Sequence, residues 1–227
     1  DLSEIHCARG WSHSSVSMIG IFGGTFDPVH NGHLETIQYG RQGLNLDQVR
    51  LIPLGHAVHR QQPIASASQR IEMLNAATIN LEGLVVDDRE INRSGGSYTV
   101  DTLESLRQDF PGKSLCLIIG TDAFNGFETW KSPDKILSLS HLVIMQRPAT
   151  DKDSIQTEFT KQLLKTRQAE TEEELQLNDS GKILFVQVPQ IDISSTMIRS
   201  KLSQHETINQ LLPSAVERLI RQWQLYQ

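Results

Sequence analysis

The sequence predicts an α/β protein with a Rossmann-like, doubly wound parallel sheet. Apolar, β-branched runs alternate with stretches of helical periodicity along the 227 residues. Strands that are apolar almost throughout are typical of parallel sheets that carry helices on both faces. Because ligands of such sheets bind beyond the carboxyl ends of the strands, a functional site is expected in the segments that follow them.

Each element of the fold is predicted from its own pattern. Apolar runs predict strands at residues 19–22, 48–53, 84–87, 115–119, 142–146 and 183–188. Helical spacing of apolar residues predicts helices at about 31–44, 66–80, 97–110 and 133–140. Ser66 and Gln69 have the spacing of a capping box, which supports the start of the second helix. A further helix near Pro213 presents an apolar stripe, which predicts a small C-terminal helical region.

Residues 18–227 are expected to form a single domain. Met18 directly precedes the first strand, and residues 1–17 lack the apolar core and the cleavage site of a signal peptide. They are interpreted as a flexible N-terminal extension. Residues 150–180 are polar and contain the acidic run ETEEE at 170–174, which predicts exposed helix and loop outside the core.

The composition limits the kinds of partner. A formal net charge of −6 argues against a broad face that binds nucleic acid. Small anionic ligands are compatible with this charge, because a local cluster of cations outweighs distant charge once salt screens the field. No apolar stretch approaches the ~18 residues of a membrane span, and the two cysteines, Cys7 and Cys116, predict no disulfide framework. A cytoplasmic protein that binds small molecules is expected, and its oligomeric state is left open.

The most informative stretch, residues 23–34, reads GGTFDPVHNGHL and connects the first strand to the first helix. Gly23 and Gly24 let the backbone pass close to a ligand, because neither has a Cβ atom. His30 and His33 are three residues apart at the start of the helix, so both can face a ligand bound at that end. The N-terminus of a helix already favours anions. The stretch therefore predicts a phosphate site, although neither a Walker A loop nor a G-x-G-x-x-G turn is present.

The pattern T-x-D-x-x-H-x-G-H, which starts at Thr25, resembles the nucleotidyltransferase superfamily. The H-x-G-H pair of that superfamily grips the phosphates of a nucleoside triphosphate. A second stretch, ISSTMIR at 193–199, places hydroxyl groups where a helix starts and Arg199 one turn later. Serine and threonine are also common helix caps, but in this superfamily such a stretch holds the triphosphate opposite the histidines. The two motifs together predict one shared site.

A third set of motifs resembles one family of this superfamily. S-Y-T-V-D-T-L begins at Ser97, G-T-D-x-x-x-x-F-x-x-W-K spans residues 120–131, and Q-R-P at 146–148 closes the next strand. Together they look like the bacterial nicotinate-nucleotide adenylyltransferases, and the resemblance covers nearly all of residues 18–227. It implies transfer of the adenylyl group of ATP to nicotinate mononucleotide, with release of pyrophosphate, as a step of NAD biosynthesis.

The resemblance also implies a role for each matching residue. The catalytic residues would be His30, His33 and Arg199. The ATP would be bound by Gly23, Gly24, Thr25, Asp122, Ser195 and Thr196. The nicotinate nucleotide would be bound by Thr99, Trp130, Lys131 and Arg147, with the ring of Trp130 stacked on the pyridine. Mg²⁺ would arrive with ATP, so no metal site made by the protein is expected.

One stretch departs from the pattern of the family. The family usually shows a P-P-H-K-type sequence after the second strand, whereas this chain reads GHAVHR at 55–60. His59 and Arg60 keep a cationic pair, which predicts phosphate contacts, and the missing prolines predict a looser loop. A zinc site at His56 and His59 is not supported, because no cysteine or carboxylate has the required spacing.

Three alternatives are weighed against this interpretation. Another acceptor, such as phosphopantetheine or nicotinamide mononucleotide, would share the H-x-G-H pair; phosphopantetheine has no need of Thr99 and Trp130. A class I aminoacyl-tRNA synthetase core would require a K-M-S-K-S-type loop and a basic face, and both are absent. A nucleotide sensor without turnover is disfavoured by the intact His30, His33 and Arg199. The preference between nicotinate and nicotinamide stays open.

Overall fold

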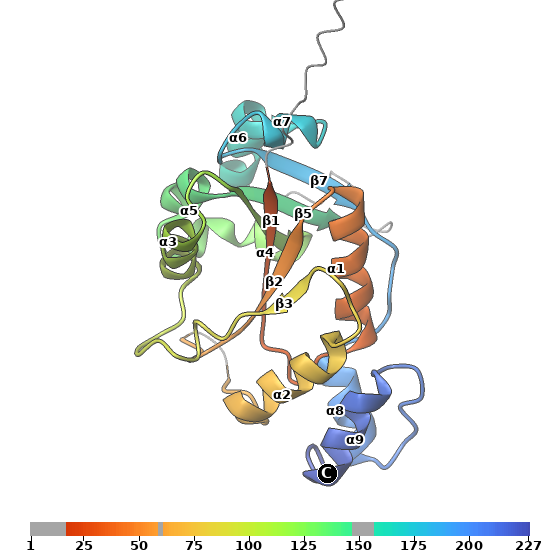
Figure 1. Ribbon diagram of the computed structural model, residues 1–227. Helices are drawn as coiled ribbons and strands as arrows, with labels where there is room; N and C mark the ends of the chain where they lie inside the picture. Colours follow the sequence, from red (N-terminus) through yellow and green to blue (C-terminus); the bar gives the residue numbers. More distant parts are fainter. Residues whose placement is uncertain (1–16, 59–60, 147–156) are drawn as a thin grey trace, which may run out of the picture.

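A seven-stranded sheet forms the centre of the protein, and every neighbouring pair of strands in it is parallel (Figure 1). The computed structural model describes residues 17–58, 61–146 and 157–227. The strand order is β3-β2-β1-β4-β5-β7-β6. The strands are β1 (Met18–Gly24), β2 (Gln48–Pro53), β3 (Leu84–Val86), β4 (Ser114–Gly120), β5 (His141–Gln146), β6 (Gln168–Ala169) and β7 (Ile183–Gln187). The predicted doubly wound sheet is confirmed.

Helices cover both faces of the sheet. They are α1 (Asn31–Gly43), α2 (Ala67–Thr78), α3 (Thr99–Asp109), α4 (Thr121–Asn125), the 3-10 turn η1 (Phe127–Thr129), α5 (Pro133–Leu139), α6 (Glu158–Arg167), α7 (Glu173–Gln176), α8 (Ser195–Ser203) and α9 (Ser214–Gln222). Apolar residues of α1, α2, α8 and α9 pack on one face, and those of α3, α4 and α5 pack on the other.

Alternation along β4 shows how the two faces are filled. Leu115 and Leu117 pack with the α3 side, whereas Cys116 and Ile118 pack with the α1 side. Side chains that alternate in this way make a strand apolar at every position. Burial raises the pKa of the Cys116 thiol to about 12, so this cysteine is an inert core residue.

The strand order indicates where on the sheet a ligand would bind. The chain runs outward from β1 to β3 and then returns to β4 on the other side of β1. This reversal creates a crevice beyond the carboxyl ends of β1 and β4, where Gly24 and Gly120 end their strands. The GGTFDPVHNGHL stretch lies at this position, as the sequence predicts.

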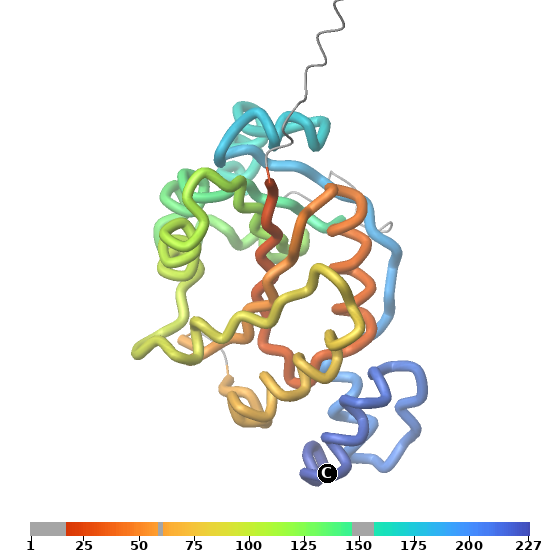
Figure 2. Tube along the Cα trace, viewed as in Figure 1, coloured from red at the N-terminus to blue at the C-terminus, as the bar shows by residue number. Residues whose placement is uncertain are grey.

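The helix signals that were read from the sequence match the structure. Ser66 caps α2, and Gln69 completes a capping box in which each side chain accepts from the other residue's backbone N–H. Val216 and Ile220 of α9 are buried in the core. The tube view shows the C-terminal region, in blue, beside α2, and α9 packs against that helix (Figure 2). The small C-terminal helical region is thus attached to the site end of the sheet.

The prediction that residues 150–180 lie outside the core is wrong for part of this segment. Gln168 and Ala169 form β6, which pairs with β7 and extends the sheet. Ala169 and Leu175 are buried in the core. Apolar side chains are interspersed among the polar ones here, and a two-residue edge strand leaves almost no periodic signal. Glu170 and Glu173, from the acidic run, are exposed as predicted.

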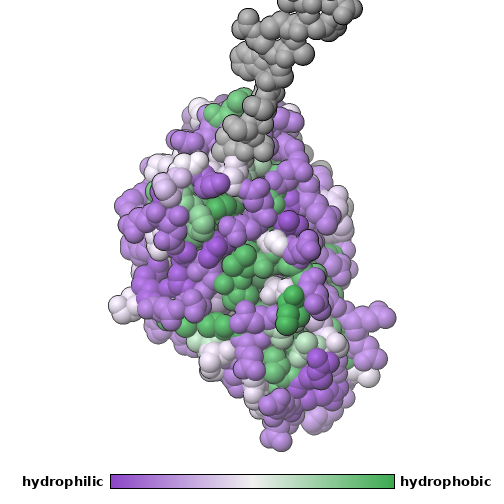
Figure 3. All heavy atoms as spheres, in the orientation of Figure 1, coloured by the Kyte–Doolittle hydropathy of each residue, from purple (hydrophilic) through white to green (hydrophobic). Residues whose placement is uncertain are grey.

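The face of the protein that is turned to the viewer in Figures 1 and 3 is mostly hydrophilic. Apolar side chains gather near the centre of this view, over the region where Figure 1 draws β2 and β3 (Figure 3). Ile79, just after α2, is 79% exposed. No helix in the described part of the chain has the length and apolar character needed to cross a membrane.

Candidate active site

The β1–α1 loop, residues 25–30, follows the two glycines that end β1. A Cβ atom on Gly24 would lie 2.9 Å from the buried ring of Phe26, so the loop conformation leaves no room for a larger residue. A Cβ atom on Gly23 would meet no other atom within 4 Å. The backbone at Gly23 therefore borders open space, which is the arrangement that a segment in contact with a ligand requires.

His30 and His33 form a reciprocal pair at the start of α1. The His33 N–H donates to His30 Nδ1 at 3.2 Å, and the His30 N–H donates to His33 Nδ1 at 3.3 Å. The rings are stacked with their centroids 3.6 Å apart. Because both Nδ1 atoms accept a hydrogen bond, each neutral ring carries its proton on Nε2. The pair presents two N–H donors at a helix end that also favours anions.

Burial keeps both histidines uncharged at neutral pH. It lowers the pKa of His30 from 6.5 to about 4. Burial, together with the charge of His30, lowers the pKa of His33 from 6.5 to about 3. The ring of Phe26 lies edge-on to His33, with 5.2 Å between the centroids, and adds to the apolar surroundings. The site therefore offers neutral donors, and a bound anion would raise both pKa values.

Gly32 leaves room for the His30 ring. A Cβ atom at this residue would lie 3.1 Å from His30 Nδ1 and 3.3 Å from the Cβ of Ile193. Both distances are tighter than an ordinary contact, so a larger residue would displace the ring or the neighbouring segment. Close packing against His30 and Ile193 thus explains why a glycine stands between the two histidines.

The α8 motif, residues 194–199, packs directly against the β1–α1 loop. Ser194 caps α8 through its hydroxyl, which accepts from the N–H of Met197 at 3.1 Å. Ser195 Oγ donates to the carbonyl of Pro28 at 2.9 Å. Arg199 Nη1 donates to the carbonyl of Asp27 at 2.7 Å. Two segments that are 167 and 172 residues apart at these contacts are therefore neighbours, and their predicted role as one shared site remains a prediction.

Thr196 and Arg199 are joined to each other. Arg199 Nη2 donates to Thr196 Oγ1 at 3.2 Å, so the hydroxyl lies beside the guanidinium on the first turn of α8. The predicted contacts of Ser195, Thr196 and Arg199 with phosphate remain predictions. The structure adds that Ser195 and Arg199 hold the backbone of the β1–α1 loop.

Asp122 lies just beyond the end of β4, the strand next to β1. It is an exposed residue in the first turn of α4, immediately after β4 ends. Because β4 pairs with β1, Asp122 and Gly24 are at the same edge of the sheet. Its predicted contact with a ribose hydroxyl remains a prediction.

The structure brings the start of α3 close to the segment after η1. Lys131 Nζ forms an ion pair with Asp101 at 3.1 Å and lies 4.3 Å from the centroid of the Tyr98 ring. Thr99, the first residue of α3, is beside these partners in the chain. Trp130 packs edge-on against Phe127, with 5.5 Å between the ring centroids. The segments that carry Thr99 and Trp130 are therefore joined through Lys131, which already has protein partners.

Three of the predicted site residues lie outside the described residues. They are His59, Arg60 and Arg147. His59 and Arg60 belong to the segment that departs from the family pattern, and Arg147 directly follows β5.

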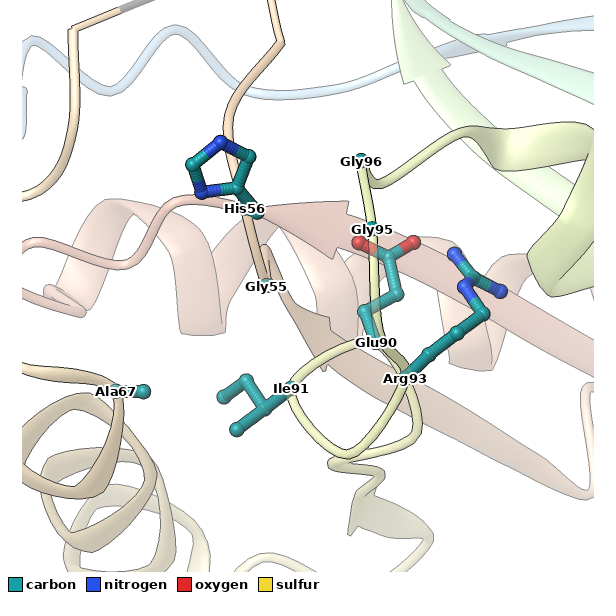
Figure 4. Close-up of a pocket in the computed structure, with 8 residues that line it drawn as sticks. All are labelled: Gly55, His56, Ala67, Glu90, Ile91, Arg93, Gly95 and Gly96. Atoms are coloured by element: carbon teal, nitrogen blue, oxygen red, sulfur yellow. The ribbon is translucent and has the colours of Figure 1, made fainter.

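A pocket of about 610 Å³ lies between the segments that follow β2 and β3 (Figure 4). We call it the β2–β3 pocket; it is lined by Gly55, His56, Ala67, Glu90, Ile91, Arg93, Gly95 and Gly96. The close-up shows His56 on one wall and the side chains of Glu90 and Arg93 on the other (Figure 4). This volume is in the range of small-molecule sites.

Hydrogen bonds from the start of α3 set the walls of the β2–β3 pocket. Thr102 Oγ1 donates to Glu90 Oε1 at 2.7 Å and accepts from Arg93 Nη2 at 3.1 Å. The Ser97 hydroxyl accepts from the N–H groups of Gly55 and His56 at 3.2 and 3.1 Å. The pocket is thus adjacent to Thr99. Sequence reasoning missed Glu90 and Arg93, although the glycines just upstream of the S-Y-T motif mark a loop at the expected edge of the sheet.

Comparison with known proteins places this site in a family. A family model described as cytidylyltransferase-like matches residues 21–201. A probable nicotinate-nucleotide adenylyltransferase of Methylococcus capsulatus is 40% identical over 210 residues, which cover 92% of this chain and 99% of that protein. The chain belongs to the nicotinate-nucleotide adenylyltransferase family. A relative of the same name from Acidithiobacillus ferrooxidans is 42% identical over 216 residues, which cover 95% of this adenylyltransferase and 99% of the relative.

Solved structures of the same kind share the fold. The nicotinic acid mononucleotide adenylyltransferase of Plasmodium falciparum, complexed with NaAD, superposes on this adenylyltransferase with a TM-score of 0.69. The match covers 92% of this chain and 97% of the other, at 18% sequence identity. At this identity the match supports the nucleotidyltransferase architecture, and the assignment to the family depends on the closer relatives.

Proposed function

We propose that this adenylyltransferase transfers the adenylyl group of MgATP to nicotinate mononucleotide, giving nicotinate adenine dinucleotide and pyrophosphate. One observation supports nucleotidyl transfer most directly: the stacked His30–His33 pair lies where α1 begins, at the end of the loop whose carbonyls accept hydrogen bonds from Ser195 and Arg199. The names of the relatives that cover the whole site support nicotinate mononucleotide as the acceptor.

The reaction requires alignment more than acid–base chemistry. An oxygen of the 5′-phosphate of the acceptor attacks the α-phosphorus of ATP, and the bond from that phosphorus to pyrophosphate breaks. The attacking oxygen is already anionic, so no general base is needed. The Nε2–H groups of His30 and His33 would donate to phosphate oxygens and stabilise the charge that develops during transfer.

Mg²⁺ enters this proposal as part of the MgATP substrate. Among the described residues, no group of three His, Cys, Asp or Glu side chains could hold a metal ion. Mg²⁺ commonly binds through substrate phosphates and keeps several waters. The contribution of the protein is then to hold the triphosphate, through the β1–α1 loop and the α8 motif.

The amino end of α3 supports recognition of an acid rather than an amide. Tyr98 is the N-cap residue of α3, so the first-turn N–H groups of this helix begin at Thr99. First-turn N–H groups at such an end can bind a carboxylate, which an uncharged amide replaces poorly. Trp130, which is half-buried, would supply a stacking surface for the pyridine ring. The adjacent β2–β3 pocket gives room for the rest of a mononucleotide.

Pyrophosphate release tests this proposal. The purified protein is incubated with MgATP and, in separate reactions, nicotinate mononucleotide, nicotinamide mononucleotide or phosphopantetheine. We expect rapid release with nicotinate mononucleotide only. Comparable rates with both pyridine nucleotides would refute acid specificity. Pyrophosphate release with phosphopantetheine alone would show that the enzyme uses an acceptor of another class. Release with none of the three would refute transfer to these acceptors.

A further inference from the structure

A buried carboxylate, Asp27, joins three distant segments beneath the β1–α1 loop. Asp27 is 4% exposed. Its Oδ1 accepts hydrogen bonds from the Tyr226 hydroxyl at 2.7 Å and from the N–H of Ala65 at 3.0 Å. Its Oδ2 accepts from the N–H of Ile64 at 2.8 Å. All three donors therefore lie outside the loop: two are backbone N–H groups of the segment before α2, and one is a side chain of the segment after α9.

The backbone on either side of Asp27 is held by charged or hydroxyl donors. Arg70, which is 2% exposed, donates through Nη1 to the carbonyl of Thr25 at 2.9 Å and through Nη2 to the carbonyl of Leu54 at 2.7 Å. Ser195 and Arg199 bind the carbonyls of Pro28 and Asp27. In a trans peptide the N–H points away from its carbonyl. The N–H groups of Phe26 and Val29 therefore point away from Arg70 and Ser195, respectively.

Tyr226 is built into this network and is not a surface residue. It lies four residues after α9 and is 7% exposed, with its ring in the same apolar cluster as Phe26 and Ile220. Burial and the Asp27 carboxylate raise the pKa of Tyr226 above its ordinary value, so the hydroxyl keeps its proton and acts as a donor. Its neighbours Leu225 and Trp223 pack against this cluster as well.

We propose that Tyr226 is a positioning residue for the reaction: its hydroxyl holds the Asp27 carboxylate and thereby fixes the β1–α1 loop in the geometry that binds the triphosphate. The hydrogen bond spans 199 residues and connects the segment after α9 to the loop that leads into the histidine pair. The proposal rests on the proposed nucleotidyl transfer, but it does not depend on which acceptor the enzyme uses.

The substitution Tyr226→Phe tests the proposal, because it removes the hydroxyl and keeps the ring. We expect the Kd for MgATP alone, measured by calorimetry, to rise several-fold, and kcat to fall about 10-fold. The KM for nicotinate mononucleotide should stay within twofold of the wild-type value. A change in the Kd for MgATP without a change in the KM for nicotinate mononucleotide distinguishes a displaced loop from a general loss of folded protein.

Two control variants separate positioning from packing. Tyr39→Phe removes the hydroxyl of a tyrosine that is 48% exposed on α1. Ile220→Val loosens the core beneath α9 and leaves the hydroxyl of Tyr226 in place. Both variants should keep the wild-type Kd and kcat, and Ile220→Val should lower Tm by a few degrees.

A double-mutant cycle with Asp27→Ala, which removes the acceptor of the Tyr226 hydroxyl, shows whether the effect passes through Asp27. If it does, Tyr226→Phe changes the Kd for MgATP much less in the Asp27→Ala background than in the wild type. Equal fold-changes in both backgrounds would overturn the proposal. So would a Tyr226→Phe enzyme with unchanged Kd and kcat, or an Ile220→Val enzyme with the same losses. Failure of the proposed acceptor would instead appear as wild-type protein that binds MgATP but forms no product.

Discussion

The two halves of the site are built in different ways. The proposed ATP half is one continuous loop between β1 and α1, whose carbonyls and buried carboxylate accept hydrogen bonds from α2, the α8 motif and Tyr226. The proposed acceptor half is assembled from short pieces: the start of α3, the residues after η1, and the walls of the β2–β3 pocket. The first is fixed by buried hydrogen bonds, and the second lies largely at half-exposed loop ends.

This difference separates the reaction from the choice of substrate. A rigid loop with neutral histidine donors suits charge stabilisation that must be in place before the reaction begins. Loops at the rim of a sheet tolerate changes that alter specificity without loss of the fold. Substitutions in the ATP half should therefore change kcat, and substitutions in the acceptor half should change the KM of the mononucleotide.

The largest effect is expected from His33→Ala. Loss of one donor to the transferring phosphate should lower kcat about 10²–10³-fold, with a much smaller change in the Kd for MgATP. Steady-state kinetics and calorimetry measure the two quantities. The matched control is His205→Asn, which removes an exposed histidine and places asparagine at a left-handed backbone position. Near wild-type turnover in His33→Ala would show that the ATP half does not depend on this donor.

Trp130→Ala should affect the other half. Loss of an aromatic stacking surface is expected to raise the KM for nicotinate mononucleotide about 10-fold to 100-fold, and the KM for ATP should be unchanged. Trp130→Phe keeps part of the surface and should recover most of the affinity. An equal rise in the KM values of both substrates would contradict the separation of the two halves.

Gly32→Ala should have an intermediate effect in the ATP half. The added Cβ would crowd the His30 ring, so we expect kcat to fall about 10-fold. Gly43→Ala is a matched control at the end of the same helix, where a Cβ would meet nothing within 4 Å. It should leave kcat unchanged and stabilise the protein by about 0.4–1 kcal/mol. Equal activity of the two variants would argue against the packing role of Gly32.

The smallest effect is the pH dependence of stability. The unfolded chain protonates His30 and His33 near pH 6.5, whereas the folded protein does so only near pH 4 and 3. Their contribution is therefore fully present above pH 6.5 and is lost as the pH falls toward these values. Urea unfolding between pH 6 and 4.5 should show a slope that is steeper, by at most about 1.4 kcal/mol per pH unit for each histidine, than in His30→Asn/His33→Asn. Identical slopes would mean that the pair titrates normally.

The proposed ATP half is easier to recognise in the sequence than the proposed acceptor half, for a physical reason. Glycines that need close approach and histidines at helical spacing form a local pattern, so GGTFDPVHNGHL was interpretable before any fold was known. The role of Asp27 was not predicted, because its partners Tyr226 and Ala65 are remote in the chain. Only folding reveals that this carboxylate is buried beneath the loop.

The acceptor half could be predicted only through a resemblance. Thr99 and Trp130 have no shared local pattern, and their segments are brought to one face of the sheet by a common apolar cluster that includes Val100 and Phe127. Strand β6 was missed for a similar reason, since its two residues are defined by pairing with β7. Long apolar strands and capped helices, in contrast, were placed to within a few residues.

Transfer of labelled phosphate tests the central claim most directly. The protein is incubated with nicotinate mononucleotide and Mg²⁺ together with ATP that carries its label either at the α-phosphorus or at the γ-phosphorus. We predict that the α-label appears in a dinucleotide and the γ-label appears in pyrophosphate, in equal amounts. An α-label that stays in ATP, or a γ-label that is released as free phosphate, would contradict adenylyl transfer at this site.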